Sequence, residues 1–458
     1  MKNTFMTVAF IVLMASTARA QNIAGDWRGT LKAGAAELRV ILHVVSDDAG
    51  GFKATLDSLD QGATGLPVAT VSRNGSSVKL ALNQIGGSFE GQIDAALTTI
   101  TGTWTQGGGS LPLVFTRVKD SAQLELRRPQ NPVKPYPYRE EEVTYDNKAA
   151  SLTLAATLTI PPGQGPFPSV VLITGSGPQD RDESLMGHRP FLVLADYLTR
   201  RGIAVLRADD RGVGKSGGNF AAATTPDFAT DAEAGVAYLR TRVEVDRRRI
   251  GLVGHSEGGI IAPMVAARNP SVAFIVLMAG SGVPGDDIIV SQSVLIAEAS
   301  GVSREQAEKN GSDLRDILAL VKQEKDEGLL NAKLREKLAE MVLPAQLGAQ
   351  IRALTAPWYR YFISYDPATA LARVNCPVLA IGGDKDLQVP ARQNLAAIRT
   401  ALAAGGNKNV EVDELPGLNH LFQTARTGAP SEYGQIEETL SPVALEKMAR
   451  WISKQAGP

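Results

Sequence analysis

From about residue 140 onwards, short runs of apolar residues alternate with longer segments that have helical periodicity. Runs such as Val170 to Thr174, Ile250 to Val253 and Val378 to Ile381 are typical of strands that are buried on both faces. Strands that alternate with helices form a mainly parallel sheet with helices on both of its faces. The pattern therefore predicts an α/β fold over residues 140–282 and 373–458.

Residues 21–118 have a different periodicity. Apolar residues such as Leu38, Val40 and Leu42 alternate with more polar neighbours, and glycine-rich turn signals interrupt the alternation. This pattern predicts a small all-β barrel or sandwich. Residues 119–139 contain four prolines and are predicted to form an extended linker, because closely spaced prolines stiffen the chain.

Residues 283–372 interrupt the strand and helix alternation. They contain no clear strand, and Leu314, Ile317 and Leu318 recur at helical spacing. An insertion of this length between two strands predicts a helical cap. The aromatic residues between 358 and 365 belong to it, and they suit either an apolar substrate pocket or the core of the cap.

Residues 1–20 have the features of a signal peptide. Lys2 supplies the positive charge, Phe5 to Ala15 is apolar, and Ala18-Arg19-Ala20 is an A-x-A cleavage site. An uncleaved membrane anchor is the alternative, but the apolar run is too short to span a bilayer comfortably. We expect cleavage after Ala20 and a secreted or periplasmic protein without an integral membrane segment.

Composition excludes several classes of function. The formal net charge of −1 gives no basic excess to neutralise phosphates, so no nucleic-acid partner is expected. Cys376 is the one cysteine, which excludes an internal disulfide and a cysteine-based zinc site. The four histidines lack ligand spacing, and no metal or organic cofactor is expected. The oligomeric state is left open.

The hexapeptide Gly254-His255-Ser256-Glu257-Gly258-Gly259 matches G-x-S-x-G. It follows a predicted strand and precedes a predicted helix, which is the setting of a nucleophile elbow. The glycines allow neighbouring backbone to approach, and the tight turn points the serine hydroxyl out of the sheet. Ser256 is the predicted catalytic nucleophile.

A serine hydroxyl needs a base to remove its proton. His420 is the predicted base, because it lies in a loop after a late predicted strand, Val410 to Leu415. His188 is the rival base and could instead line the pocket mouth. His255 adjoins the nucleophile in sequence and is interpreted as a packing residue.

An imidazole base needs a carboxylate that fixes its tautomer and stabilises its charged form. Two acids compete in the segment after the strand Val378 to Ile381, and Asp386 is preferred over Asp384. The resulting chain order of Ser256, Asp386 and His420 is the order of an α/β-hydrolase triad.

The tetrahedral oxyanion of acyl transfer needs two backbone N–H donors. One is predicted to come from Glu257, which follows the nucleophile, and the other from the loop after an early strand. That loop is Thr174-Gly175-Ser176-Gly177-Pro178. The N–H of Ser176 is the first choice for the second donor, and that of Gly177 is the alternative.

The predicted α/β part resembles the α/β-hydrolase superfamily, and within it bacterial carboxylesterases. The resemblance rests on G-H-S-E-G-G at Gly254 to Gly259, on G-S-G-P-x-D-R-D at Gly175 to Asp182, and on N-H-L-F at Asn419 to Phe422. The segment Asp209 to Ser216 also resembles a structural loop of these enzymes. Many superfamily members carry histidine where this chain has Thr174.

The resemblance implies hydrolysis of a small-molecule carboxylic ester through an acyl-enzyme, with a lid over the pocket. A serine peptidase or a thioesterase would use the same triad and is the first alternative. The second alternative is a non-catalytic binding protein that uses the β segment at residues 21–118.

Overall fold

The computed structural model of the protein describes residues 22–33, 36–47, 50–61, 63–120, 127–342 and 344–456. The predicted signal peptide at residues 1–20 lies outside these residues. The chain divides into two compact units, the first made mainly of residues up to Glu125 and the second of Leu126–Pro458. Each unit has its own hydrophobic core.

The first unit is an antiparallel sheet in the order β4-β3-β2-β1-β9-β8-β7-β6-β5. Its strands are β1 (Gly25–Ala33), β2 (Ala36–Ser46), β3 (Phe52–Ser58), β4 (Ala63–Val68), β5 (Thr70–Asn74), β6 (Ser77–Leu82), β7 (Gly87–Ile93), β8 (Thr99–Gln106) and β9 (Gly109–Arg117). Contacts between β3 and β5 and between β4 and β6 bring the two edges together in a barrel-like shape. Trp27, Phe89 and Phe115 fill its centre.

The second unit contains a mixed sheet in the order β10-β11-β13-β12-β14-β15-β16-β17. Its strands are β10 (Arg139–Asn147), β11 (Leu152–Ile160), β12 (Phe167–Ile173), β13 (Ala204–Ala208), β14 (Val245–His255), β15 (Phe274–Met278), β16 (Val378–Gly383) and β17 (Val410–Leu415). The pairs β10·β11 and β11·β13 are antiparallel, and all the others are parallel.

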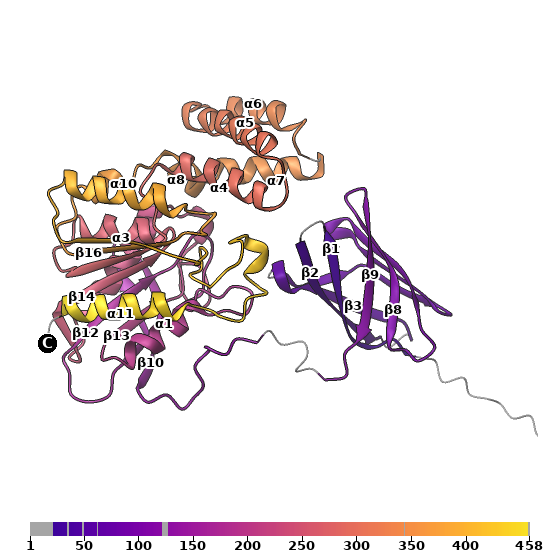
Figure 1. The fold of residues 1–458 in the computed structure, drawn as a ribbon, viewed down its shortest axis with the longest axis horizontal. Helices are drawn as coiled ribbons and strands as arrows, with labels where there is room; N and C mark the ends of the chain where they lie inside the picture. The colour runs from indigo at the N-terminus through magenta and orange to yellow at the C-terminus, as the bar shows by residue number, and fades with distance from the viewer. Residues whose placement is uncertain are drawn as a thin grey trace, which may run out of the picture. The chain divides into compact units, whose positions relative to one another are not determined.

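Helices cover both faces of this sheet (Figure 1). One face carries α1 (Pro190–Thr199) and α11 (Pro442–Ala456), and the other carries α2 (Thr225–Leu239), α3 (Gly258–Ala266) and α10 (Ala391–Ala404). Successive side chains of a strand point to opposite faces. Accordingly, Val170 packs in the cluster of α1 and α11, while Val171 packs in that of α2, α3 and α10. Two-sided burial explains why central strands such as β15 and β16 are apolar throughout.

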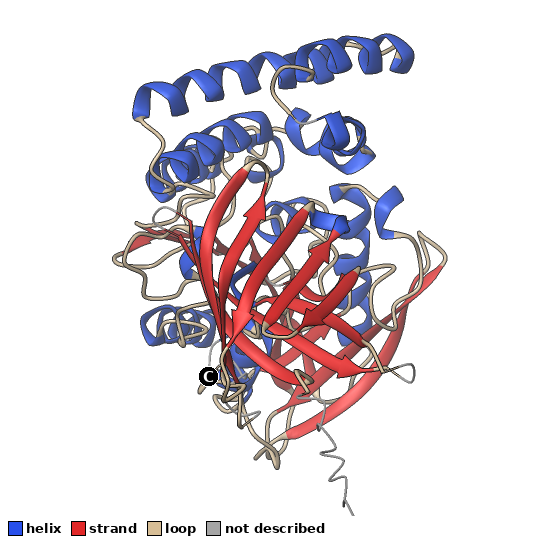
Figure 2. Cartoon of the chain, turned by 90° about the vertical axis from the view of Figure 1, so that its right-hand side faces the viewer, coloured by secondary structure: helices blue, strands red, loops and turns tan. Residues whose placement is uncertain are grey.

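A helical cap is inserted between β15 and β16. It consists of α4 (Gly285–Ala299), α5 (Arg304–Gln323), α6 (Glu327–Leu338), α7 (Pro344–Thr355), α8 (Pro357–Ser364) and α9 (Ala368–Leu371). Figure 2 shows the contrast between the all-helical cap and the strand-built first unit. The core of the cap also includes Ile260 of α3 and Val389, so the cap packs against the sheet-bearing part of the same unit.

The predicted fold class is confirmed: an α/β-hydrolase fold with a helical cap follows a small all-β unit. Parallel strands present their carboxyl ends at one edge of the sheet, and β12 neighbours β14 while β16 neighbours β17. Loops that leave these four strands therefore meet at that edge. They carry the residues predicted to be the oxyanion donors, the nucleophile, the acid and the base.

Candidate active site

Ser256 lies in the turn between β14 and α3. Its φ angle is +52°, in the left-handed region that residues other than glycine rarely adopt. Its backbone N–H donates a hydrogen bond of 2.8 Å to the carbonyl of Met278, the last residue of β15. The turn is thus anchored to the sheet in the strained conformation of a nucleophile elbow.

The two glycines that flank Ser256 stand at contacts where no side chain fits. A Cβ atom built on Gly254 would lie 2.0 Å from the carbonyl oxygen of Gly258. A Cβ atom built on Gly258 would lie 2.2 Å from the carbonyl oxygen of Ile173, at the end of β12. The G-x-S-x-G spacing is therefore required by the close packing of β14, α3 and β12.

His420 and Asp386 lie in the loops after β17 and β16 and are joined by a hydrogen bond. Nδ1 of His420 lies 2.8 Å from Oδ2 of Asp386. Because an ionised carboxylate only accepts, Nδ1 of His420 carries a proton and donates a hydrogen bond to Asp386. The other oxygen of Asp386 accepts from the backbone N–H groups of Gln388 and Val389, each at 2.8 Å. The Asp386 side chain is 0% exposed.

Asp384 has a different task. Its Oδ1 accepts a hydrogen bond of 2.6 Å from the backbone N–H of Gly417, and this bond braces the turn that follows β17. Of the two acids that the sequence left in competition, the structure therefore brings Asp386 to His420. Asp384 acts on the backbone of the loop that carries the histidine.

The loop after β12 passes directly beside the nucleophile. A Cβ atom built on Gly175 would lie 3.2 Å from Cβ of Ser256. Within the described part of the chain, the backbone N–H groups of Ser176 and Glu257 donate no hydrogen bond to a protein acceptor. Both are therefore available to an oxyanion. Ser176 lines the pocket that contains Ser256, whereas Gly177 lines a separate pocket.

The pocket at the nucleophile has a volume of about 220 Å³. Ser176, Ser256, Gln388, His420 and Leu421 are among the residues that line it. Loops from four different strands thus converge on one cavity. This is the arrangement in which a nucleophile, a base and an oxyanion donor can act on one carbonyl group.

His255 and Glu183 also border this pocket. Nδ1 of His255 lies 2.9 Å from Oε1 of Glu183, and Nε2 lies 3.0 Å from the carbonyl oxygen of His420. His255 is therefore buried but is more than a packing residue. Sequence reasoning missed Glu183, which is one position beyond the G-S-G-P-x-D-R-D segment and has no motif of its own.

His188, the rival base, is placed away from the nucleophile. Its ring is fully buried, with Nδ1 2.9 Å from the hydroxyl of Thr439 and Nε2 3.0 Å from the carbonyl of Tyr433. Burial lowers the pKa of His188 to about 4. A neutral ring held by these bonds braces the segment before α11, and it does not border the pocket of Ser256.

The Glu257 side chain links the cap to the nucleophile turn. Its Oε1 accepts hydrogen bonds of 2.7 Å from the hydroxyl of Thr225 and from the indole Nε1–H of Trp358 in cap helix α8. Burial raises the pKa of Glu257 above its ordinary value, and the two donors oppose this rise. Glu257 therefore offers its backbone to the site and its side chain to the cap.

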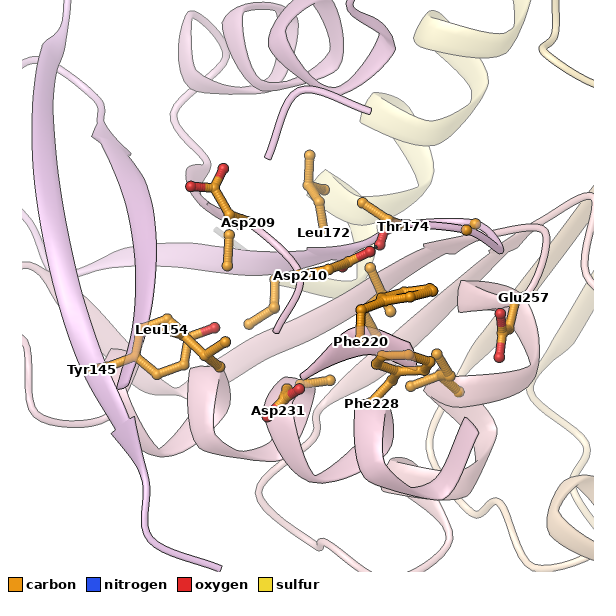
Figure 3. A pocket seen from close by; sticks show the side chains of 17 residues that line it. Tyr145, Leu154, Leu172, Thr174, Asp209, Asp210, Phe220, Phe228, Asp231 and Glu257 are labelled. Atoms are coloured by element: carbon orange, nitrogen blue, oxygen red, sulfur yellow. Dashed lines mark hydrogen bonds between the residues drawn. The ribbon is translucent and has the colours of Figure 1, made fainter. Parts of the chain in front are cut away.

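A smaller pocket of about 50 Å³ is also lined by the oxyanion loop, through Thr174, Gly175 and Gly177 (Figure 3). Phe220, Phe228, Asp210 and Glu257 contribute to its walls. Burial raises the pKa of Asp210 to about 7, and the Glu257 carboxylate adds to the rise. Asp210 accepts a hydrogen bond of 2.8 Å from the Thr174 hydroxyl, so a carboxyl that titrates near neutrality supports the oxyanion loop.

The described residues contain no group of three or more His, Cys, Asp and Glu side chains that could hold a metal ion. None of their helices is both long and apolar enough to cross a membrane.

The fold and the site together define a serine hydrolase of the α/β-hydrolase class. Within that class, the chain belongs to the X-Pro dipeptidyl-peptidase (S15) family, whose pattern matches residues 151–409.

Similar proteins include esterases. Esterase EstD of Thermotoga maritima is 26% identical over 343 residues, which cover 73% of this chain and 72% of that protein. A hypothetical protein of Pseudomonas aeruginosa, PA2218, has a solved structure with 20% identity and a TM-score of 0.42, over 71% of this chain and 96% of that one. The Pyrococcus furiosus esterase Pf2001 has 16% identity and a TM-score of 0.43, over 72% and 97%.

Proposed function

We propose that the protein is a carboxylesterase that cleaves small-molecule esters through an acyl-enzyme intermediate. Ser256 is the nucleophile, His420 the general base, and Asp386 the carboxylate that orients the base. The backbone N–H groups of Glu257 and Ser176 form the oxyanion hole. The observation that carries the proposal is one pocket shared by a strained Ser256 and by a His420 whose Nδ1 is bonded to buried Asp386.

In the acylation step, Nε2 of His420 takes the proton of Ser256 as Oγ attacks the ester carbonyl carbon. The carbonyl π electrons move to oxygen, and the N–H groups of Glu257 and Ser176 stabilise this oxyanion. As the tetrahedral intermediate collapses, the bond to the alcohol oxygen breaks, and His420 gives its proton to that oxygen. The alcohol leaves, and Ser256 remains acylated.

Deacylation repeats the same chemistry with water. His420 removes a proton from the water, whose oxygen attacks the acyl carbon, and the oxyanion forms in the same hole. Collapse breaks the bond to Oγ, which recovers its proton from His420. The Asp386 carboxylate stabilises the imidazolium during both steps, and it keeps its own charge because it is not a proton carrier.

The test is a series of p-nitrophenyl esters of increasing acyl length, turned over by the wild type and by Ser256→Ala. We expect turnover by the wild type and a loss on the order of 10⁶-fold in kcat for the variant. Equal rates in the two proteins would reject Ser256 as the nucleophile. A fluorophosphonate probe that labels the wild type and spares Ser256→Ala is the independent check.

A peptidase is the second candidate, because the family whose pattern matches this chain is described as X-Pro dipeptidyl-peptidase. Support for the esterase comes from the relative in Thermotoga maritima, which is described as an esterase. The comparison pairs an X-Pro p-nitroanilide with a p-nitrophenyl ester, since their chromophores are closely related. We expect a higher kcat/KM for the ester, and preference for the X-Pro anilide would favour the peptidase.

We further propose that the protein is exported, with cleavage after Ala20. The support is the sequence of residues 1–20, with Lys2, an apolar run and an A-x-A site. N-terminal sequencing of the protein recovered from the medium or periplasm tests it. A chain that begins at Gln21 is the expected result, and a chain that retains Met1 or Lys2 in the cytoplasmic fraction would contradict it.

A further inference from the structure

The His255 ring is buried between two hydrogen-bond acceptors. Its Nδ1 faces Oε1 of Glu183 at 2.9 Å, and its Nε2 faces the carbonyl oxygen of His420 at 3.0 Å. A carbonyl oxygen only accepts. A carboxylate also only accepts, and Oε1 of the Glu183 carboxylate receives the backbone N–H of Gly175 at 2.7 Å as well. Both ring nitrogens of His255 must therefore carry a proton, which makes the ring an imidazolium.

The charges around His255 agree with this protonation state. Burial alone would lower its pKa, but the Glu183 carboxylate, the carbonyl of His420 and the Asp386 carboxylate together raise the pKa above its ordinary value. The His420 imidazole also lies against the ring, with the two ring centroids 4.9 Å apart. Glu183 and His255 thus form an ion pair with side-chain exposures of 8% and 6%.

Glu183 is held in place by a strained backbone. Its φ angle is +53°, a conformation that costs about 1 kcal/mol or more in a residue with a side chain. Its backbone N–H donates a hydrogen bond of 2.9 Å to the carbonyl of Asp180. The cost of this strain is offset by the two hydrogen bonds of the carboxylate, one with the N–H of Gly175 and one with the ring of His255.

These contacts form a continuous path around the nucleophile. The path starts at the N–H of Gly175, in the oxyanion loop, runs through Glu183 and His255, and ends at the backbone carbonyl of His420. His255 is also the residue before Ser256, and Gly175 is in close contact with Ser256. One ion pair therefore connects the backbone of the oxyanion loop, the nucleophile turn and the base loop.

We propose that Glu183 and His255 are positioning residues, and that their ion pair fixes the oxyanion loop and the His420 loop at one separation around Ser256. This inference rests on the proposed ester hydrolysis, since it assigns a task within that site. The pair contacts the backbone of the loops that carry the reacting groups, whereas Asp386 contacts the side chain of His420. Without the pair, the N–H donor of Ser176 and the imidazole of His420 would no longer be held at a fixed separation.

The first test is kinetic, with Glu183→Ala, Glu183→Gln and the exposed control Glu142→Gln. Glutamine keeps an oxygen for the N–H of Gly175 but removes the charge, whereas alanine removes both. We expect kcat to fall about 100-fold for Glu183→Ala and about tenfold for Glu183→Gln, because small misplacements of reacting groups cost this much. KM should stay within about threefold, since ground-state binding does not depend on the pair.

The control makes the same glutamate-to-glutamine change at Glu142, which does not border the pocket of Ser256. Glu142 in β10 also forms an ion pair, since its Oε2 lies 2.7 Å from Nη1 of Arg181. Arg181 lies in the same loop as Glu183, between β12 and α1. The Glu142 side chain is 63% exposed, so Glu142→Gln should leave kcat and KM near the wild-type values. Thermal midpoints of all variants identify any that fail to fold.

The second test reads the protonation state without using activity. The chain has four histidines, so ¹⁵N-histidine labelling gives few imidazole signals, and His255→Asn assigns those of His255. At about pH 8, above the ordinary histidine pKa, we expect both ring nitrogens of His255 to carry a proton in the wild type and in Ser256→Ala. In Glu183→Gln the ring should become neutral.

The outcomes separate this inference from the proposed function. A neutral His255 ring in the wild type, or an unchanged kcat in folded Glu183→Ala, would overturn the inference even if the ester is hydrolysed. A raised KM for Glu183→Ala with an unchanged kcat would also overturn the inference, because it would assign the pair to substrate binding. A doubly protonated His255 in a wild type that turns over no ester would support the ion pair and contradict the esterase.

Discussion

The indole Nε1–H of Trp358 donates a hydrogen bond to Oε1 of Glu257 at 2.7 Å. This contact ties cap helix α8 to the residue that follows Ser256 and supplies one proposed oxyanion donor. The carboxylate is buried, and among the described residues it has no cationic partner. The cap is thereby attached to the site by a hydrogen bond from the neutral indole of Trp358 to the buried carboxyl group of Glu257.

Replacing Trp358 by phenylalanine tests this attachment. Trp358→Phe removes the N–H donor while retaining an aromatic ring against Phe362, whose ring is stacked on that of Trp358 at 5.1 Å. We expect the free energy of unfolding to fall by about 1–3 kcal/mol, because a buried acceptor loses a partner. Urea unfolding monitored by circular dichroism measures it.

The control for this change is a double-mutant cycle. In a Glu257→Gln background the acceptor is neutral, so Trp358→Phe should cost less than it does in the wild type. The neighbouring Tyr359→Phe should change stability by no more than about 0.5 kcal/mol, since no hydrogen bond joins the Tyr359 hydroxyl to the described residues. Equal costs for Trp358→Phe in both backgrounds would contradict the role of the carboxylate.

The two aspartates after β16 should respond in opposite ways to the same substitution. Asp386→Asn replaces the carboxylate bonded to Nδ1 of His420, and we expect kcat to fall on the order of 10⁴-fold because the wrong histidine tautomer is favoured. Asp384→Asn keeps a carbonyl oxygen for the N–H of Gly417, so its kcat should remain near that of the wild type. Steady-state rates with one activated ester decide the matter, and a larger loss for Asp384→Asn would reverse the assignment.

The oxyanion hole can be tested by removing a backbone donor. Ser176→Pro deletes the N–H at that position, whereas Ser176→Ala deletes only the hydroxyl. We expect kcat to fall about 10²–10³-fold for the proline variant, the loss typical of one oxyanion donor, and to change little for the alanine variant. If folded Ser176→Pro is as active as Ser176→Ala, the second donor is another group, and Gly177 becomes the first choice.

The buried carboxyl of Asp210 predicts a particular pH dependence of stability. Its pKa is raised to about 7 in the folded protein, from 3.8. Between about pH 4 and pH 7 the folded state therefore binds this proton more tightly than the unfolded state, and its contribution to the free energy of unfolding falls as pH rises. The full effect, of the order of 4 kcal/mol, is reached above pH 7.

Asp210→Asn removes this titration. The stability of the variant relative to the wild type should therefore increase as pH rises from about 4 to about 8. Unfolding midpoints measured for both proteins across this range provide the comparison. A difference that stays constant with pH would show that Asp210 titrates at its ordinary value in the folded protein.

Local sequence patterns were sufficient to predict the fold class and to propose the individual members of the site. G-x-S-x-G between a strand and a helix identified Ser256, because that spacing reflects steric demands that are visible in sequence. The apolar runs of β14 and β16 are likewise a local consequence of burial on both faces. The order of nucleophile, acid and base followed from the order of the strands that carry them.

Features that depend on tertiary contacts were not accessible in the same way. The sequence preferred Asp386 over Asp384 but did not give the partner of either, and the loop after β17 supplies both: His420 for Asp386 and the N–H of Gly417 for Asp384. Glu183 acts on Gly175, which is close in sequence, but also on His255, which is distant from it. The choice of Trp358 as the partner of Glu257 depends on how the cap packs, and aromatic spacing in a helix does not encode it.

The central claim is that Ser256 carries the acyl group during turnover. Rapid mixing of the protein with excess p-nitrophenyl ester, followed by acid quenching and peptide mass spectrometry, measures it directly. We expect a burst of nitrophenol and an acyl adduct on the peptide at Ser256, with both absent in Ser256→Ala. An adduct on another residue, or a burst of the same size in the alanine variant, would show that Ser256 is not the acylated residue.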